Sequence, residues 1–141
     1  MEQVKQPRGI RNNNPLNLRK GENWQGLSPV QSDPSFCQFK SMVYGLRAAH
    51  KLLRNYITGW DGRRKPFDTL ATIIPKWAPP SENATQKYLD FVCKDTGLDA
   101  RERVHFLDRN VMCDIVSAMA FVECGQRIDR ALIESAYDLL R

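Results

Sequence analysis

The chain has 141 residues, of which 42% are hydrophobic and 26% are charged. That length suits one domain with a single core, and the composition excludes the disordered and collagenous classes of protein. The net charge of +5 favours a polyanionic partner, such as the anionic bacterial wall, an acidic membrane surface or nucleic acid.

The basic residues are scattered along the chain, and the densest groups are residues 63–65 and the pair Arg101 and Arg103. Because no continuous basic stripe marks a duplex-binding face, we do not expect nucleic acid to be the partner. A charged surface that only aids solubility is the alternative reading of the same composition.

No apolar stretch approaches the roughly 18 residues that a membrane-spanning helix needs, and no charged leader followed by an apolar run opens the chain. We therefore expect synthesis in the cytoplasm without a signal peptide, and no membrane span. If the substrate lies in the periplasm or cell wall, a holin, a virion or a secretion machine must carry the protein there.

The four cysteines show no CxxC spacing, and only His50 and His105 could join them in a metal site. We therefore expect no metal and no cofactor. Cys93 and Cys113 fall among apolar helical residues, where a buried reduced thiol is expected rather than a disulfide.

The first 40 residues are rich in Asn, Gly and Pro and carry little periodicity. Pro15, Pro29 and Pro34 interrupt any helix, so this segment predicts an irregular lobe with a short β-ribbon at most. An irregular segment of this length is commonly functional.

Helical periodicity begins after this lobe. Leu46, Ala49 and Leu53 recur at helical steps between a capping Ser41 and a terminating Gly59. A second, short helix is expected from a capping Asp68 through Leu70, Ile73, Ile74 and Trp77, bent by Pro75 and ended by Pro79 and Pro80.

Three further helices follow. The run NATQKYLDFVCKDTG places Tyr88, Leu89, Val92 and Cys93 on one side and ends at Gly97. Asp108 caps a segment that is apolar nearly all round over residues 111–122 and ends at Gly125, which is typical of a central helix. Asp129 starts an outer helix that turns inward Leu132, Ile133, Ala136, Tyr137 and Leu140. The sequence thus predicts one mainly α domain over residues 1–141, with an irregular lobe (1–40) and a helical body (41–141).

Among the six glutamates, Glu123 has the most informative position. It continues the apolar stripe of Met112, Val116 and Met119, so its carboxyl group should meet an apolar surface at the end of the central helix. Burial raises the pKa of a carboxyl group, as a general acid requires. A boundary glutamate paired with an arginine such as Arg127 is the alternative, and periodicity alone leaves both open.

Two other carboxylates are candidates. Glu82 should lie near the start of a helix, where the dipole lowers a carboxyl pKa, so it fits a base, an orienting group or a simple helix stabiliser. Glu22 lies in a loop bounded by Gly and Asn and ranks third. We expect Glu2, Glu102 and Glu134 to be structural or neutral.

Several aromatic and amide residues lie beside polar or loop residues, as is typical of sugar-binding sites, where rings stack and amides bind hydroxyl groups. For each residue, a place in the core or in a turn is the alternative. The candidates are Asn13, Asn14, Asn17, Trp24, Phe39, Tyr44, Trp77 and Tyr88.

The strings RGIRNNNPLNLRK, NWQG, FCQFKSMVYGLRAAHKLLRNY and TLATIIPKWAPPSENATQKYLDFVCKDTG occur in that order. Over residues 8 to about 97 they resemble a phage and prophage family of small virion-associated, lysozyme-like proteins, whose phrases are NNNP, WAPP and ENxT. Leu16 stands where glycine is expected, which leaves a tight substrate-facing turn at that position open.

The same order also resembles, more distantly, the bacterial glucosaminidase and lytic transglycosylase group. In that group an acid glutamate at a helix end precedes an asparagine-led loop, an aromatic segment and a helix. Here Asn17-Leu18 and residues 36–41 match the later parts, whereas the acid-bearing helix is the C-terminal AMAFVECG. We hypothesise a circularly permuted lysozyme-like arrangement that folds Glu123 back beside the asparagine-rich lobe.

The resemblance implies cleavage of peptidoglycan glycan strands as a lytic transglycosylase or muramidase, with Glu123 as the acid and Glu82 in reserve. The main alternative is a non-enzymatic virion structural or wall-binding protein, with virion or tail proteins as partners. That alternative predicts a buried ion pair at Glu123 and no cleft that reaches it.

Overall fold

A computed structural model describes residues 6–59, 66–80 and 84–140. Glu2, Glu82 and the basic residues 63–65 lie outside these described residues. Within them the chain is mainly helical, as predicted, with isolated β-bridges in place of a sheet. The helices are α1 (Arg8–Arg11), α2 (Met42–Thr58), α3 (Leu70–Trp77), α4 (Thr85–Thr96), α5 (Arg109–Cys124) and α6 (Arg130–Asp138).

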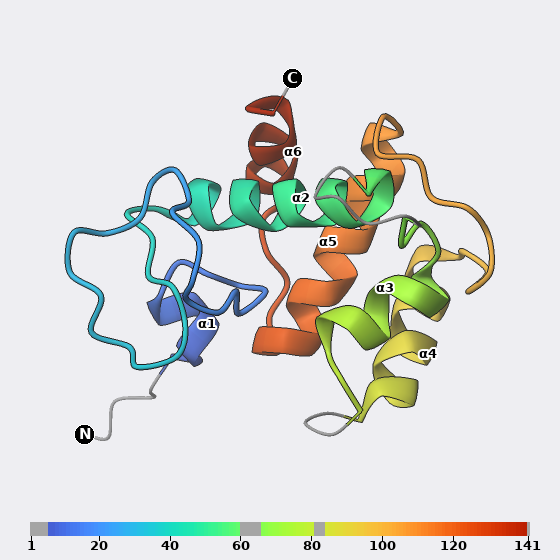
Figure 1. Cartoon of the computed structure of the whole chain (residues 1–141), viewed down its shortest axis with the longest axis horizontal. Helices are drawn as coiled ribbons and strands as arrows, with labels where there is room; N and C mark the ends of the chain where they lie inside the picture. The colour runs from blue at the N-terminus through green and yellow to red at the C-terminus, as the bar shows by residue number, and fades with distance from the viewer. Residues whose placement is uncertain (1–5, 60–65, 81–83, 141) are drawn as a thin grey trace.

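Helix α5 forms the centre of the molecule, as its apolar sequence predicts. Met112, Ile115, Val116 and Met119 are fully buried, and α5 contacts α1, α2, α4 and α6. Figure 1 shows α5 running diagonally behind α2, with α3 and α4 toward one end of α2 and α1 with the N-terminal lobe toward the other. The end of α5 therefore lies between the lobe and the α3–α4 side of the body.

The ends of three helices are confirmed. Helices α2, α4 and α5 stop at Gly59, Gly97 and Gly125, each of which adopts the left-handed conformation that closes a helix. The carboxylate of Asp108 accepts a hydrogen bond from Val111 N at 3.2 Å, as expected of an N-cap. None of the described helices is both long and apolar enough to cross a bilayer.

The predicted start of α3 was off by one residue. Thr69, rather than Asp68, is the N-cap, because its hydroxyl group accepts from Thr72 N while the Thr72 hydroxyl accepts from Thr69 N. Asp68 instead forms an ion pair with Arg103 at 3.1 Å. The reciprocal threonine pair satisfies two backbone donors at once, which a lone aspartate would not.

Two side-chain predictions were wrong in part. Leu132 was expected to face inward but is 37% exposed, because α6 buries only the narrower stripe of Ile133, Ala136 and Tyr137. All four cysteines are free, and Cys113 is buried as predicted, whereas Cys93 is only half-buried.

The N-terminal lobe contains one turn of helix, α1, that the sequence interpretation missed. Its Gly9 is buried, and a Cβ atom there would lie 3.3 Å from Cys124 Cβ and 3.2 Å from Asn17 Oδ1. The missing side chain therefore allows α1 to pack closely against the end of α5. This contact brings the lobe to Glu123.

Asn14 holds the rest of the lobe together. Its amide group donates to Leu18 O and Cys37 O, both at 3.0 Å, and its Oδ1 accepts from Leu18 N at 2.9 Å. A tight turn forms around Leu16 although this residue is not the glycine that was expected, since Asn17 N donates to Asn14 O at 3.0 Å. The Leu16 side chain is fully buried. Antiparallel bridges join Arg19 to Phe36 and Leu27 to Phe39.

Candidate active site

Glu123 occupies the last turn of α5, where the apolar stripe of that helix reaches the lobe. Its Oε1 accepts a hydrogen bond from Asn17 Nδ2 at 3.1 Å, and its Oε2 accepts one from the Tyr88 hydroxyl group at 3.1 Å. The carboxyl group is thus held between the lobe and α4. Both of its oxygen atoms have a fixed partner.

Burial raises the pKa of Glu123, and the hydrogen bonds from Asn17 and Tyr88 and the positive charge of Arg19 oppose that shift. The pKa of Tyr88 is raised well above its usual value by burial and by the neighbouring Glu123 charge. Its hydroxyl group therefore stays protonated and remains a donor to Oε2. A carboxyl group with a raised pKa holds its proton nearer to neutral pH, as a general acid must.

The Glu123 side chain lines a cavity of about 420 Å³ that we call the acid cavity. A volume of this size falls in the range of small-ligand sites. It is lined by Arg8, Asn17, Arg19, Phe36, Trp77, Ala78 and Glu123. Residues of the lobe therefore form one wall, and the end of α3 and the end of α5 form the others.

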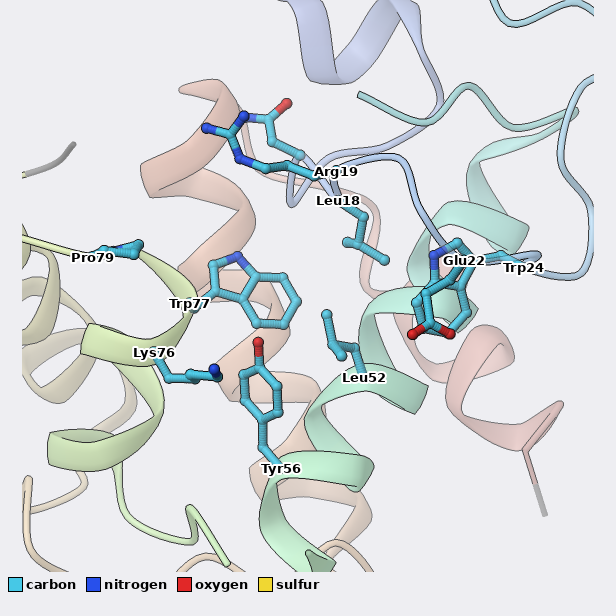
Figure 2. Close-up of a pocket in the computed structure, with 10 residues that line it drawn as sticks. Leu18, Arg19, Glu22, Trp24, Leu52, Tyr56, Lys76, Trp77 and Pro79 are labelled. Carbon is cyan, nitrogen blue, oxygen red and sulfur yellow. The ribbon is translucent and has the colours of Figure 1, made fainter. Parts of the chain in front are cut away.

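A second cavity of about 400 Å³ adjoins the acid cavity and shares Asn17, Arg19 and Trp77 with it. We call it the tryptophan cavity. Figure 2 shows Trp77 and Lys76 of α3 on one side of it, Trp24 and Glu22 of the lobe on the opposite side, and α2 below. Its remaining lining residues are Leu18, Leu52, Tyr56 and Pro79. The two cavities together form a groove that passes Trp77.

The structure brings together six of the residues that the sequence singled out, which are Glu123, Asn17, Tyr88, Trp77, Trp24 and Glu22. Asn17 and Tyr88 bind the Glu123 carboxyl group, Trp77 lines both cavities, and Trp24 lines the tryptophan cavity. Trp77 Nε1 also donates to Leu16 O at 3.4 Å, which links α3 to the lobe.

Four of the other candidates lie away from the groove. Asn13 donates to Phe39 O at 3.0 Å, and Asn14 is fully buried in the lobe, so both amides act as turn formers here. Phe39 is 3% exposed within the core, and Tyr44 packs against that core. Glu82 lies outside the described residues, so its place relative to the groove is not described.

Sequence reasoning missed three of the large side chains that line the acid cavity, Arg8, Arg19 and Phe36. The guanidinium carbons of both arginines lie 5.1 Å from the centre of the Phe36 ring. Arg8 and Arg19 stand on either side of the asparagine-rich string, and this placement was the sequence signal that could have indicated a role in the site. That the three side chains meet follows from the contacts of both arginines with the Phe36 ring, which the spacing alone does not predict.

Arg127 does not provide the ion pair that the alternative reading gave to Glu123. It pairs instead with Asp95, with Nη2 and Oδ1 2.7 Å apart, and its guanidinium carbon lies 4.6 Å from the centre of the Phe121 ring. Among the described residues there is also no cluster of three His, Cys, Asp or Glu side chains that could hold a metal ion. The chemistry available in the groove is therefore that of a partly buried carboxylic acid among aromatic, amide and guanidinium groups.

No family model matches the chain. The chain is similar to protein P5 of Pseudoalteromonas phage PM2, with 35% identity over 122 residues that cover 84% of this chain and 71% of that protein. Residues 41–141, the helical body, make up less than 84% of the chain, so the matched stretch includes part of the lobe.

Proposed function

The chain belongs to the family of phage protein P5, and from that premise and the acid cavity we propose that it cleaves the glycan strands of bacterial peptidoglycan. The observation that carries the proposal is the Glu123 carboxyl group, which has a raised pKa and lines a sugar-sized cavity beside Trp77 and Asn17. Burial beside a cleft is how a carboxylic acid is kept protonated for glycosidic bond cleavage.

In the proposed reaction Glu123 donates its proton to the glycosidic oxygen between N-acetylmuramic acid and N-acetylglucosamine. The bond to the muramoyl anomeric carbon breaks, and the positive charge that develops there is quenched by a hydroxyl group of the same muramoyl residue. The proton of that hydroxyl group passes to the Glu123 carboxylate, which restores the acid. The product carries an anhydro-muramoyl end.

We favour this transglycosylase route over hydrolysis because of the cavity's lining. A hydrolase needs a second carboxylate to direct water or to act as nucleophile. Glu123 is the only carboxylate among the described residues that line the acid cavity, and Glu22 lies on the tryptophan cavity beside it. Water directed by Glu22 is the hydrolytic alternative, and the product distinguishes the two.

The test is release of muropeptides from purified peptidoglycan sacculi, identified by mass. We expect anhydro-ended products from the wild-type protein and a loss of at least about a hundredfold with Glu123→Gln, in line with the usual contribution of a general acid. Glu102→Gln is the matched control, because Glu102 is exposed and lines neither cavity. Equal release by the wild-type and Glu123→Gln proteins would refute the assignment.

One observation supports a second candidate, a virion protein that binds wall glycan without cleaving it. Both carboxyl oxygens of Glu123 already have hydrogen-bond donors, so the group also serves as a bridge from α5 to the lobe and to α4. This candidate predicts that the protein sediments with sacculi and releases no muropeptide. It also predicts that Glu123→Gln lowers stability and leaves sacculus binding unchanged.

A further inference from the structure

Two guanidinium groups contact one aromatic ring in the acid cavity. The guanidinium carbons of Arg8 and Arg19 each lie 5.1 Å from the centre of the Phe36 ring. At that distance the face of the ring attracts a cation, which limits the conformations of both side chains. Both arginines also line the cavity that contains Glu123.

A buried carboxylate holds Arg8 in place. Arg8 Nε lies 3.3 Å from Asp33 Oδ2, and the other oxygen of Asp33 accepts hydrogen bonds from Ser35 N and Phe36 N, both at 2.9 Å. Those backbone bonds lower the pKa of Asp33 to about 2, so it stays ionised. Asp33 thus fixes both the Phe36 backbone and the Arg8 side chain, and its contact to Arg8 is through Nε.

Backbone pairing holds Arg19 in place. Arg19 and Phe36 face one another across an antiparallel bridge, and Lys20 N donates to Ser35 O at 3.0 Å. Side chains opposite one another in such a bridge are neighbours. The arginine pair is therefore preorganised from two independent directions, which lowers the entropic cost of binding a ligand.

The position of the pair disfavours the proposed reaction on its own. A cation beside the scissile bond repels the positive charge that develops on the sugar, and Arg19 lowers the pKa of Glu123, which weakens an acid. Asp33 pairs with Arg8 but does not line the acid cavity, so an anionic group of the substrate that contacts both arginines would counter their charge within the cavity. The sugar rings themselves are uncharged, so such an anionic group would be a substituent of the sugar.

We propose that Arg8 and Arg19 form a carboxylate-binding pair that recognises an acidic substituent on the muramic acid residues of the strand. The inference rests on the proposed function. Guanidinium groups are suited to it because their planar donors match a carboxylate in bidentate geometry. Two sources carry this group, the peptide stem and, where the stem has been removed, the lactyl carboxylate of the sugar.

Equilibrium binding to three purified oligosaccharides of equal length tests the inference, with the Glu123→Gln protein so that the ligands persist. The first ligand is a glycan fragment with peptide stems, the second is the same fragment stripped by an amidase and therefore bearing lactyl carboxylates, and the third is a chitooligosaccharide without carboxylates. We expect at least one carboxylate-bearing ligand to bind about tenfold or more tightly than the chitooligosaccharide. Which of the two binds more tightly identifies the source.

Arg8→Gln and Arg19→Gln, each introduced into Glu123→Gln, should abolish that preference, so that each variant binds the carboxylate-bearing ligands no more tightly than it binds the chitooligosaccharide. Arg11→Gln is the matched control, because Arg11 is exposed on the same short helix as Arg8 and lines neither cavity. Circular dichroism checks that the variants fold.

Equal affinity for all three ligands, or a preference that survives in both arginine variants, overturns the inference alone, since glycan binding persists. Failure to bind any ligand, together with no release from sacculi by the wild-type protein, overturns the proposed function as well.

Discussion

The side-chain amide of Asn17 and the carboxyl group of Glu123 are 3.1 Å apart, although 106 positions separate them in the sequence. The same amide nitrogen lies 3.3 Å from the backbone oxygen of Glu123. Asn17 adopts a φ of 53°, a left-handed conformation that asparagine tolerates better than most residues. A turn in the lobe thus directs one amide to the end of α5.

Replacement of Asn17 by glycine should remove the hydrogen bond from the Asn17 amide to Glu123 without backbone strain, because glycine accepts a positive φ. We expect a loss of about 1–2 kcal/mol in the free energy of unfolding, since a partly buried carboxyl group loses a donor. The pKa of Glu123 should also rise, because the hydrogen bond from the Asn17 side chain lowers it in the wild-type protein. The alkaline limb of muropeptide release against pH should then move to higher pH.

Asn13→Gly provides the control for this prediction. Asn13 has the same φ of 53°, and its amide donates to Phe39 O rather than to Glu123. It should cost a similar amount of stability and leave the alkaline limb in place. An unchanged limb in Asn17→Gly would show that the amide does not tune the acid.

Replacement of Tyr88 by phenylalanine removes only the hydroxyl group that donates to Glu123 Oε2 at 3.1 Å. The expected results are a loss of about 1 kcal/mol in stability and a higher pKa for Glu123, with an alkaline limb displaced upward. Tyr137→Phe is the comparison, because it removes a 2.8 Å hydrogen bond to Phe106 O away from Glu123. If both substitutions displaced the limb alike, the effect would come from general loosening of the fold and not from Tyr88.

The helices were predictable because their signals are local. Apolar periodicity placed the central helix, and Asp108 and Gly125 marked its two ends. Glu123 stood out for the same reason, since it continues a buried stripe. The position of a glutamate along one helix is enough to predict that its side chain is buried. That position does not predict which residues of other segments surround it.

The composition of the groove was not predictable, because it depends on contacts between distant segments. The sequence gives no sign that Arg19 and Phe36 pair across a bridge, or that Gly9 allows α1 to reach Cys124. The amides illustrate the same limit. Asn14 and Asn17 stand three positions apart in one polar string, yet one is buried in the lobe and the other binds Glu123.

Replacement of Gly45 by alanine should disrupt the junction of the lobe and α2. A Cβ atom at this position would lie within 1.8 Å of Asn13 O, which is a backbone atom that cannot move aside alone. The expected loss is about 3 kcal/mol or more in the free energy of unfolding, although alanine favours helices over glycine. Chemical denaturation measures it, with Lys51→Ala in the same helix as a control that should change stability by less than about 1 kcal/mol. A Gly45→Ala protein as stable as the wild type would contradict the close packing of α2 against the lobe.

His50 should make the protein less stable in mild acid. Its Nε2 lies 3.1 Å from Ile133 O, joining α2 to α6, and its Nδ1 is buried with no hydrogen-bond partner among the described residues. Burial lowers the pKa of His50 to about 4 from the ordinary 6.5. Between these two values the unfolded chain binds a proton that the folded protein does not, so the free energy of unfolding falls as the pH falls from 6.5 towards 4. The full effect corresponds to about 3 kcal/mol.

Denaturation at fixed ionic strength from pH 7 to pH 4 measures this slope. Glu123 acts in the opposite sense, since its raised pKa means that the folded protein binds a proton more readily than the unfolded chain, so the wild-type slope alone is a difference of two effects. His50→Gln isolates the histidine, because the glutamine amide offers a donor to Ile133 O but does not titrate. Its stability should therefore fall less with acid than that of the wild type. His105→Gln, at an exposed position, should keep the wild-type slope. Parallel curves for the wild-type and His50→Gln proteins would mean that protonation of this buried ring does not limit stability in acid.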